Sequence, residues 1–329
     1  MTSGTEHRVT VERLPDVYAP TLGEIVLDGL TRPFKELPPK LLYDARGSEL
    51  FEQITELQEY PFSRAERSLL ETHAPAIASE AQGCELVELG AGYATKTRLL
   101  LDAMRAAGEL RRYVPLDVSE ASLRAGGETL AREYPDLSIQ AVVGDFEHDL
   151  GRLFRSTGGR VVAFFGGTIG NLPPGSRARF LRSVASVLGP NGRLVLGTGL
   201  VADARMLEAA YDDAQGITAE FNRNVLHVLN RELGADFDPG AFEHVAFYDR
   251  EHQWIEMRLR AVERMTVTIP AINLTVELAP RDEIRTEISA KFSVAGIERE
   301  LRAAGLEPLA IYRDDWFAVT VARPAASPR

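Results

Sequence analysis

A glycine-rich loop is the sharpest chemical signal in the chain. It occupies residues 87–97, where Gly90 and Gly92 follow a short apolar run and precede a helical pattern. Glycine lacks a Cβ, so these positions let the backbone approach a bound ligand closely. The dinucleotide fingerprint would need a third glycine where Thr95 stands, and the lysine pattern of a phosphate-binding loop is absent. The loop predicts either a small-molecule site or, as the alternative, a turn that only joins strand to helix.

Two acidic residues end the next two predicted strands. Asp117 could accept the hydroxyls of a ribose, while Asp145 could accept an adenine amine, with Phe146 flanking the ring. Each carboxylate taken alone is better explained as a helix N-cap. Ligands of open parallel sheets bind at the carboxyl ends of the strands, however, and three signals at three successive strand ends favour a ligand. The Glu-x-Gly-x-Gly loop resembles the cofactor loop of S-adenosylmethionine-dependent methyltransferases.

A second run of small residues follows the fourth predicted strand. Residues 164–172 read FFGGTIGNL, in which Gly166 and Gly167 clear space and Asn171 offers two donors and an acceptor. In a methyltransferase of this architecture, that edge faces the reactive methyl group. The alternative is a glycine-rich turn in which Asn171 is only a cap.

Residues 286–289 carry a carboxylate and a hydroxyl two positions apart. A strand would point Glu287 and Ser289 to one face and Ile288 to the other, and such a pair suits the two nitrogens of an imidazole. Glu287 would also favour a protonated or strongly oriented ring. Taken alone, the neighbouring charges favour a solvated strand face instead. Met257 taken alone is core filler, and Tyr211 is predicted on a helix, where core packing is the alternative to a binding role.

Alternating strands and helices must position these residues. The alternation predicts a parallel sheet with helices on both faces. The predicted strands are residues 85–89, 112–116, 137–143, 160–165 and 192–197.

The segments on either side of this alternation read differently. The first 65 residues are predicted to be mostly helical, with one helix over 41–60 and another over 64–73 that Pro75 interrupts. The alternating region is followed by a predicted helical stretch over 204–233, with a pause near Gly216. Four antiparallel strands are predicted next, at residues 242–247, 254–261, 263–269 and 274–278. A helix over 294–304 and a hairpin of residues 308–312 and 316–321 are predicted last.

Composition bounds the function. The 329 residues exceed the size at which one core usually stops growing, so we expect two lobes. A net charge of −11 disfavours general nucleic-acid binding, and the single Cys84 excludes an internal disulfide. We expect no signal peptide, no membrane span and no metal site, because no long apolar run and no metal-ligand histidine spacing is found. We therefore expect a cytoplasmic protein, and a monomer.

Several blocks together resemble one family, the histidine-specific N-alpha-methyltransferases of ergothioneine biosynthesis. The resemblance runs from about residue 20 to about residue 323. It is carried by LYDARGS at 42–48, Pro61, Arg64, Glu66, GGTIGN at 166–171, AYDD at 210–213, FNRNV at 221–225, IEM at 255–257 and TEISAKF at 286–292.

The resemblance implies an α/β fold: a Rossmann-like class I methyltransferase fold with a C-terminal β-hairpin, split by an α+β substrate-binding domain. The substrate-binding domain would comprise residues 1–62 and 200–289. The methyltransferase domain would comprise residues 63–199 and 290–329.

The resemblance also implies the reaction and the residues that carry it. S-adenosylmethionine would methylate the α-amine of L-histidine three times to give hercynine, with Tyr43 and Asn171 as the catalytic candidates. The cofactor would be held by Tyr43, Gly90, Lys96, Asp117, Asp145 and Phe146. The substrate carboxylate would be gripped by Asn171 and Tyr211, with Gly166 near the amine, and the imidazole would be surrounded by Tyr60, Met257, Glu287 and Ser289.

Other functions stay open at this point. A relative could methylate another amino acid or aromatic amine, although Glu287 and Met257 disfavour a tryptophan-type ring. Thr95 disfavours a nicotinamide-dependent oxidoreductase. A non-catalytic module that binds S-adenosylmethionine is disfavoured by the presence of Asn171, Tyr211 and Glu287.

Overall fold

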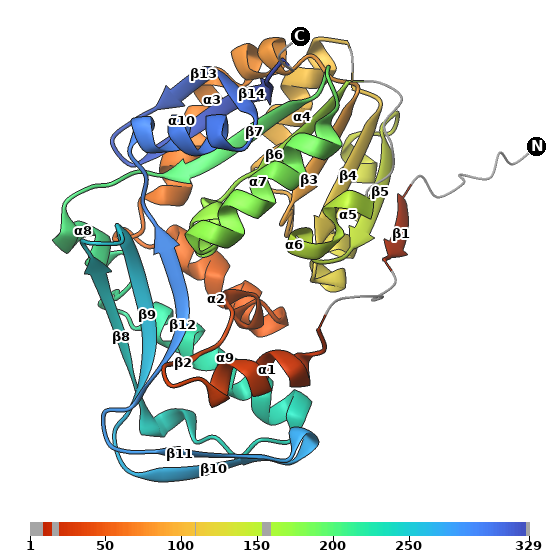
Figure 1. The fold of residues 1–329 in the computed structure, drawn as a ribbon. Helices are drawn as coiled ribbons and strands as arrows, with labels where there is room; N and C mark the ends of the chain where they lie inside the picture. Colours follow the sequence, from red (N-terminus) through yellow and green to blue (C-terminus); the bar gives the residue numbers. More distant parts are fainter. Residues whose placement is uncertain (1–8, 15–19, 109, 153–158, 327–329) are drawn as a thin grey trace, which may run out of the picture.

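The chain forms two lobes (Figure 1). A cavity lies at their boundary. The computed structural model describes residues 9–14, 20–108, 110–152 and 159–326. The predicted domain division extends to residues 1–8 and 327–329, which lie outside the described residues. One lobe is built on an eight-stranded sheet, and the other on a four-stranded sheet with a separate two-stranded hairpin.

The large sheet has the strand order of a doubly wound α/β fold. Its five central strands are parallel and run in the order β5-β4-β3-β6-β7, and the antiparallel β14 and then β13 extend the β7 edge. The predicted α/β fold with its C-terminal hairpin is therefore confirmed. The strands are β3 (Glu85–Leu89), β4 (Arg112–Asp117), β5 (Ser138–Val143), β6 (Arg160–Phe164), β7 (Arg193–Gly199), β13 (Leu306–Arg313) and β14 (Phe317–Pro324).

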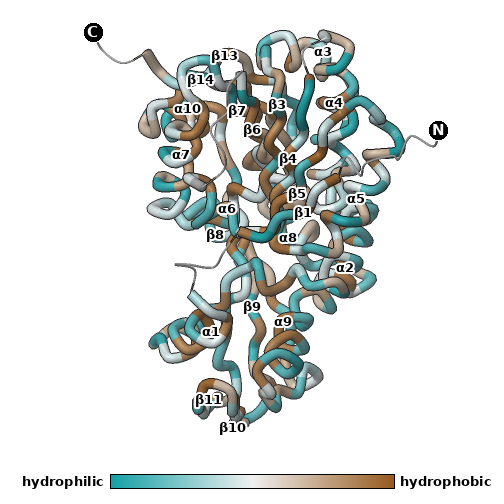
Figure 2. The backbone as a smooth tube through the Cα atoms, turned by 90° about the vertical axis from the view of Figure 1, so that its right-hand side faces the viewer, coloured by the Kyte–Doolittle hydropathy of each residue, from teal (hydrophilic) through white to brown (hydrophobic). Residues whose placement is uncertain are grey.

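Both faces of this sheet are buried, which is why its strands read as continuous apolar runs. Leu86 belongs to a core shared with the helices α3 and α4, whereas its neighbour Val87 belongs to a core shared with α7 and α10. Figure 2 shows the hydrophobic residues concentrated along the central strands. The helices of this lobe are α3 (Phe62–Ala81), α4 (Thr97–Ala106), α5 (Glu120–Glu133), α6 (Phe146–Asp149), α7 (Pro174–Leu188) and α10 (Val294–Ala303), with the short turns η2 (Leu150–Arg152) and η3 (Thr168–Asn171).

The N-terminal segment differs from its prediction. Residues Val9–Arg13 form β1, which pairs in parallel with β5. This strand was not predicted, and it places residues 9–13 on the large sheet although the predicted division assigns them to the substrate-binding domain. Its alternating polar and apolar residues give a weak local signal, and the unpaired edge of β5 supplies the partner that selects the strand.

The predicted helix over 41–60 is also wrong in its extent. A 3₁₀ turn, η1 (Pro39–Leu42), comes first, and α2 runs only over Ala45–Glu56. Asp44 stops the helix from starting earlier, because its side chain accepts the Gly47 N–H at 2.8 Å as an N-cap. Pro75 does not interrupt the next helix: α3 continues through it, held by its packing against α4 and β14.

The smaller lobe combines segments from two parts of the chain. Its sheet has the order β2-β12-β9-β8, and α9 packs against both α2 and this sheet. Its elements are α1 (Leu22–Thr31), β2 (Lys35–Glu36), α8 (Ala204–Ala209), α9 (Ile217–Leu233), η4 (Pro239–Ala241), β8 (Phe242–Asp249), β9 (Trp254–Ala261), β10 (Met265–Ile269), η5 (Pro270–Ile272), β11 (Leu274–Leu278) and β12 (Glu283–Ala290).

Two of the chain crossings between the lobes are hydrogen-bonded to each other. The Phe292 N–H donates to Gly199 O at 2.9 Å, and the Val201 N–H donates to Phe292 O at 3.0 Å. The exit from β7 and the exit from β12 are thereby tied together, so the end of β12 is fixed against the large lobe.

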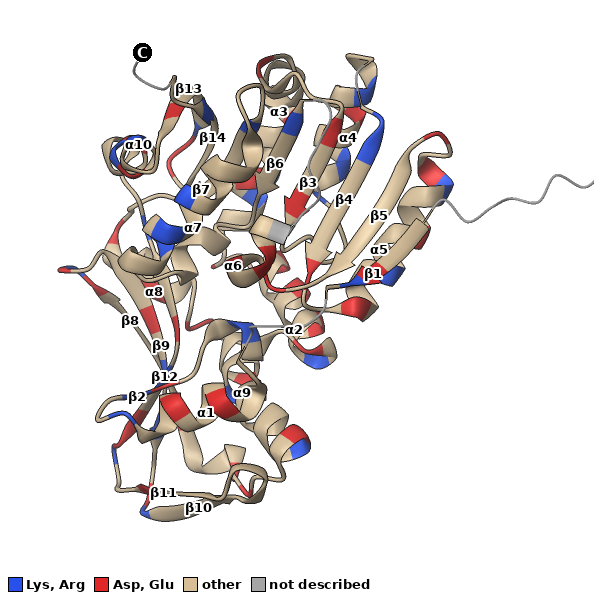
Figure 3. Cartoon of the chain, turned by 45° about the vertical axis from the view of Figure 1, so that its right-hand side comes forward, with Lys and Arg blue, Asp and Glu red and all other residues tan. Residues whose placement is uncertain are grey.

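Charged residues of both signs are interspersed over both lobes (Figure 3). Within the described part of the chain, no helix is both long and apolar enough to cross a bilayer.

The contact of η3 with β12 yields a stability prediction. A Cβ added at Gly170 would lie 2.7 Å from Ala290 O and 3.0 Å from Ala290 N, and both of these atoms belong to backbone. Gly170→Ala should therefore lower the free energy of unfolding by about 1–3 kcal/mol, as overpacking does. Urea denaturation measures this change.

Gly175→Ala is the matched control. A Cβ there would lie 3.7 Å from Arg179 Nη1, which is ordinary contact, and the position is in the first turn of α7. This variant should be as stable as the wild type or slightly more stable. Equal stabilities for the two variants would refute the close packing of η3 on β12.

Candidate active site

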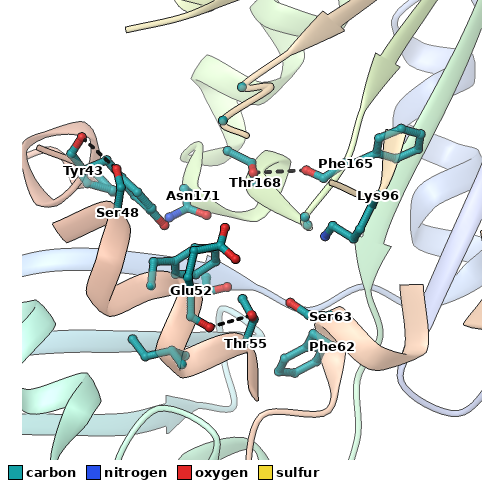
Figure 4. Close-up of a pocket in the computed structure, with 18 of the residues that line it drawn as sticks. Tyr43, Ser48, Glu52, Thr55, Phe62, Ser63, Lys96, Phe165, Thr168 and Asn171 are labelled. Atoms are coloured by element: carbon teal, nitrogen blue, oxygen red, sulfur yellow. Dashed lines mark hydrogen bonds between the residues drawn. The ribbon is translucent and has the colours of Figure 1, made fainter. Parts of the chain in front are cut away.

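A cavity of about 550 Å³ lies at the boundary of the two lobes. Its walls come from the glycine loop after β3, the ends of β4, β5 and β6, the segment from η1 to the start of α3, and the strands β9 and β12. Figure 4 shows Tyr43, Lys96 and Asn171, which come from three different elements, around this cavity. Every site residue predicted from the sequence lines it: Tyr43, Tyr60, Gly90, Lys96, Asp117, Asp145, Phe146, Gly166, Asn171, Tyr211, Met257, Glu287 and Ser289.

The glycine loop leaves open space beside its backbone. Gly90 and Gly92 have φ values of +66° and +50°, which a side chain would strain. Apart from the adjacent residues of the chain, no described residue has a heavy atom within 4 Å of a Cβ built at either position. The Gly92 N–H donates to Asp117 Oδ2 at 2.9 Å, so the loop is tied to the end of β4. This geometry suits close approach of a ligand to the backbone.

The carboxylates of Asp117 and Asp145 accept hydrogen bonds from backbone N–H groups, and both also line the cavity. Asp117 also accepts the Ser119 N–H at 2.9 Å, and burial raises its pKa against the effect of these hydrogen bonds. Asp145 accepts the Glu147 N–H at 2.9 Å as the N-cap of α6. The sequence alternatives, cap or ligand acceptor, therefore do not exclude one another, because a carboxylate has about four lone-pair sites.

Lys40 reaches Asp145 from the smaller lobe. The Lys40 ammonium lies 2.8 Å from Asp145 Oδ2. Burial alone would raise the pKa of Asp145, but the charge and the hydrogen bond of Lys40 lower it below its usual range. Phe146, next in the chain, packs edge-on against Phe164 and Phe180, with centroids 5.0 and 5.7 Å away. Sequence reasoning gave Lys40 no role, because its partner lies 105 residues away.

Glu66 is a second residue that sequence reasoning left without a role. Its side chain is fully buried on α3, where Oε1 accepts the Gly166 N–H at 2.8 Å. The Lys96 ammonium pairs with Oε2 of the same carboxylate. One carboxylate therefore fixes both the small-residue turn after β6 and the lysine of the glycine loop. Glu66 belongs to a block quoted for the family resemblance, and that was the available signal.

The strand β12 places Glu287 and Ser289 on the cavity side, as their alternation predicts. Both are buried, and Ile288 between them packs into the core of the large lobe. Met257 lies directly opposite Glu287 in the β9–β12 register. The alternative of a solvated strand face is therefore wrong at these positions.

Glu287 is a buried carboxylate with unused capacity to accept hydrogen bonds. Among the described residues, none hydrogen-bonds its Oε2 atom, whereas the Asn171 side chain hydrogen-bonds the carboxylate. Burial raises the pKa of Glu287 to about 7, opposed by the charge of Lys291 and by the Asn171 hydrogen bond. A buried acceptor of this kind favours a ligand that brings an N–H group.

The sequence predicted Tyr211 on a helix, but this residue lies just beyond the end of α8. Its hydroxyl is 2.8 Å from Ser289 Oγ and accepts a hydrogen bond from Lys291 Nζ at 2.8 Å. Lys291 was quoted within a family block but given no role. Its signal was its position two residues beyond Ser289, on the same face of an extended chain.

Aromatic rings close the cavity on the side of α2. Tyr43 packs edge-on against Phe51 and Phe221, with centroids 5.4 and 5.3 Å away. Tyr60 packs edge-on against Tyr211 at 5.9 Å. Burial, and secondarily the charge of Glu287, raises the pKa of the Tyr43 hydroxyl well above 10. That phenol therefore keeps its proton and can act as a donor. In the described ranges, no group of three His, Cys, Asp or Glu side chains is placed to hold a metal ion.

Residues 22–324 match the family described as S-adenosylmethionine-dependent, histidine-specific methyltransferases. The chain is 50% identical over 291 residues to the histidine N-alpha-methyltransferase of Mycolicibacterium smegmatis, covering 88% of this chain and 90% of that protein. It is 49% identical over 290 residues to the histidine N-alpha-methyltransferase of Mycobacterium tuberculosis, with the same coverage. It is 34% identical over 243 residues to ergothioneine biosynthesis protein 1 of Schizosaccharomyces pombe, covering 70% of this chain and 31% of that protein.

The carboxylate beneath the glycine loop yields a pH prediction. Burial raises the pKa of Glu88 to about 7, although Thr97 and Tyr113 donate hydrogen bonds to it. Between the unfolded value of about 4.3 and 7, the folded protein holds a proton that the unfolded chain has released. The contribution of Glu88 to the free energy of unfolding therefore falls as the pH rises through this window.

Glu88→Gln removes this titration. The free energy of unfolding of the variant, minus that of the wild type, should increase between pH 5 and 8 by up to about 3 kcal/mol. Urea denaturation at several pH values measures the difference. A difference that is constant over this range would mean that Glu88 is ionised in the folded protein throughout.

Proposed function

We propose that this chain, which belongs to the family of S-adenosylmethionine-dependent, histidine-specific methyltransferases, methylates the α-amine of L-histidine three times to give hercynine, as a step of ergothioneine biosynthesis. The observation that carries the substrate assignment is the buried pair Glu287 and Ser289, whose acceptor and hydroxyl both face the cavity.

The cavity fits the cofactor at its large-lobe end. The open space beside Gly90 and Gly92 allows a ligand to lie against the loop, and Asp117 keeps acceptor capacity after its two backbone contacts. S-adenosylmethionine supplies a methyl group already activated on a sulfonium. The residues that would hold it are Tyr43, Gly90, Lys96, Asp117, Asp145 and Phe146.

The small-lobe end would hold the imidazole. Glu287 would accept the ring N–H at its free Oε2 atom, and the Ser289 hydroxyl would face the other ring nitrogen. Met257 and Tyr60, both buried, would pack against the ring. A neutral imidazole carries one donor and one acceptor nitrogen, which this pair complements.

The α-amine and the carboxylate would lie between these two ends. Asn171 and Tyr211 would bind the carboxylate, and Gly166 would lie near the amine. Gly166 and Gly167 have positive φ values and no side chains, which supports a pocket that accepts a growing ammonium group. A free α-amine has a reference pKa of about 7.7–8.0, so a useful neutral fraction exists near pH 7 without a strong base.

The chain's contribution to the reaction is then alignment rather than acid–base chemistry. Methyl transfer to nitrogen is a direct displacement that depends on proximity and orientation. The raised pKa of Tyr43 makes its phenol a donor that orients a neighbouring acceptor, not a base. Water would carry away the proton released at each transfer.

The proposal also assigns the lobes. Apart from β1, which lies on the large sheet, residues 1–62 together with residues 200–289 would form the substrate-binding domain. Residues 63–199 and 290–329 would form the methyltransferase domain. The residues proposed for the cofactor and for the substrate line one cavity of this chain, so the proposed site needs no residue of a second copy, and we propose a monomer that acts in the cytoplasm.

Mass spectrometry tests the function directly. The purified protein is incubated with S-adenosylmethionine and all twenty amino acids in one pool. We expect histidine to gain three methyl groups and the others none. Methylation of another amino acid would refute the assignment of Glu287 and Met257, whereas binding of the cofactor without any methylation would indicate a non-catalytic module.

A charge-removing substitution tests the ring site. Glu287→Gln keeps the shape of the side chain but replaces a charge-assisted hydrogen bond with a neutral one. The KM for histidine should rise about 10-fold, with the Kd for S-adenosylhomocysteine unchanged. Steady-state kinetics and calorimetry measure the two quantities.

Glu283→Gln serves as the control. Glu283 lies on the same strand but pairs with Arg258 and Arg260 outside the cavity. Its variant should keep the wild-type KM. Equal effects of the two substitutions would show that Glu287 acts on the strand rather than on the substrate.

A further inference from the structure

Lys291 is a buried lysine whose ammonium group is held at the cavity wall. Nζ donates to Tyr211 Oη and to Ser289 Oγ, each at 2.8 Å, and only 5% of the residue is exposed. It also lies over the rings of Phe62 and Tyr211, 4.2 and 4.7 Å from their centroids. Neither the ring site nor the cofactor site described above assigns it a role.

The backbone around Lys291 is as constrained as its side chain. Its N–H donates to Gln253 O at 2.8 Å, and Phe292, the next residue, forms the bridge to Gly199 and Val201 at the lobe crossing. The lysine is therefore presented from a fixed strand end, and its ammonium cannot move away without breaking its hydrogen bonds to Tyr211 and Ser289.

The donors of the Lys291 ammonium fix the direction of its hydrogen bonds to the two hydroxyls. A lysine ammonium has three donors and no acceptor, so both hydroxyl oxygens must accept from it. Each hydroxyl then keeps its own proton to donate elsewhere. Tyr211 Oη and Ser289 Oγ lie 2.8 Å apart, so one of these protons can join the two oxygens, and the other is directed away from Lys291. Both protons can be donated into the cavity only when a ligand with two acceptors replaces the hydrogen bond between the two hydroxyls.

Glu287 is a hydrogen-bond acceptor beside the two hydroxyl donors. It is an acceptor when ionised, and its charge favours the charged form of Lys291. Burial opposes that charge and lowers the pKa of Lys291 to about 7, so an anionic ligand in the cavity would help to keep the ammonium protonated.

We propose that Lys291 is a positioning residue for the methylation reaction, which makes the hydroxyls of Tyr211 and Ser289 hydrogen-bond donors towards the substrate. Tyr211 then donates to the substrate carboxylate, and Ser289 donates to the unprotonated ring nitrogen while Glu287 accepts from the ring N–H. The inference rests on the proposed function. It adds that one cation sets the polarity at both ends of the amino acid, and that the neutral imidazole is the form bound.

Lys291→Met tests the proposal, since methionine has a similar length but no donor and no charge. The KM for histidine should rise about 10-fold or more, while kcat falls less and the Kd for S-adenosylhomocysteine stays unchanged. Lys291→Gln keeps two N–H donors and should recover part of the loss. If the methionine variant does not fold, as judged by circular dichroism, the glutamine variant is measured against the wild type in its place.

A double-mutant cycle separates hydroxyl orientation from general damage. In a Ser289→Ala background, the substitution at Lys291 should raise the KM for histidine by a clearly smaller factor than in the wild type, because one of its two partners is already gone. Equal factors in the two backgrounds would overturn the inference, and so would a wild-type KM for Lys291→Met or an equal loss of S-adenosylhomocysteine binding. A wild-type protein that does not methylate histidine overturns the proposed function itself.

Discussion

Burial of the polar strand β12 is the constraint on which the site depends. The strand packs Ile288 into one core and presents Glu287 and Ser289 to the cavity, so its polar groups leave bulk water and must find partners. Thr286 meets this demand inside the smaller lobe, where its hydroxyl donates to Asn222 Oδ1 at 2.5 Å. No described residue hydrogen-bonds Glu287 Oε2, and this buried acceptor supports the proposal that a ligand binds there.

The same network holds Tyr211, which no helix supports. Asn222 Nδ2 donates to His244 Nδ1 at 2.9 Å, which leaves His244 Nε2–H to donate to the Tyr211 carbonyl at 2.8 Å. Burial lowers the pKa of His244, in agreement with the neutral ring that these two bonds require. A chain of buried hydrogen bonds thus extends from Thr286 beside the ring site to the backbone of Tyr211, so the strand and the turn hold one geometry.

The sequence predicts features whose cause is local and misses those whose cause is remote. Alternating strands and helices predicted the sheet, and the alternation of Glu287 with Ile288 predicted the cavity face. Lys40 binds Asp145, 105 residues away, and Glu66 binds Gly166, 100 residues away, so no local sequence pattern predicts these contacts. Pro75 read as a helix breaker, but tertiary packing of α3 outweighs the one hydrogen bond that proline removes.

A direct displacement needs no strong base, so alignment across the lobe boundary is what the fold must supply. The contacts that cross that boundary include the Lys40–Asp145 ion pair, the hydrogen bonds between Phe292 and the exit of β7, and the packing of Gly170 against β12. Each joins a segment of the smaller lobe to the lobe that carries the glycine loop. Since a misplacement of about 1 Å can cost about 100-fold in rate, these contacts matter to the reaction although none of them touches the reacting atoms.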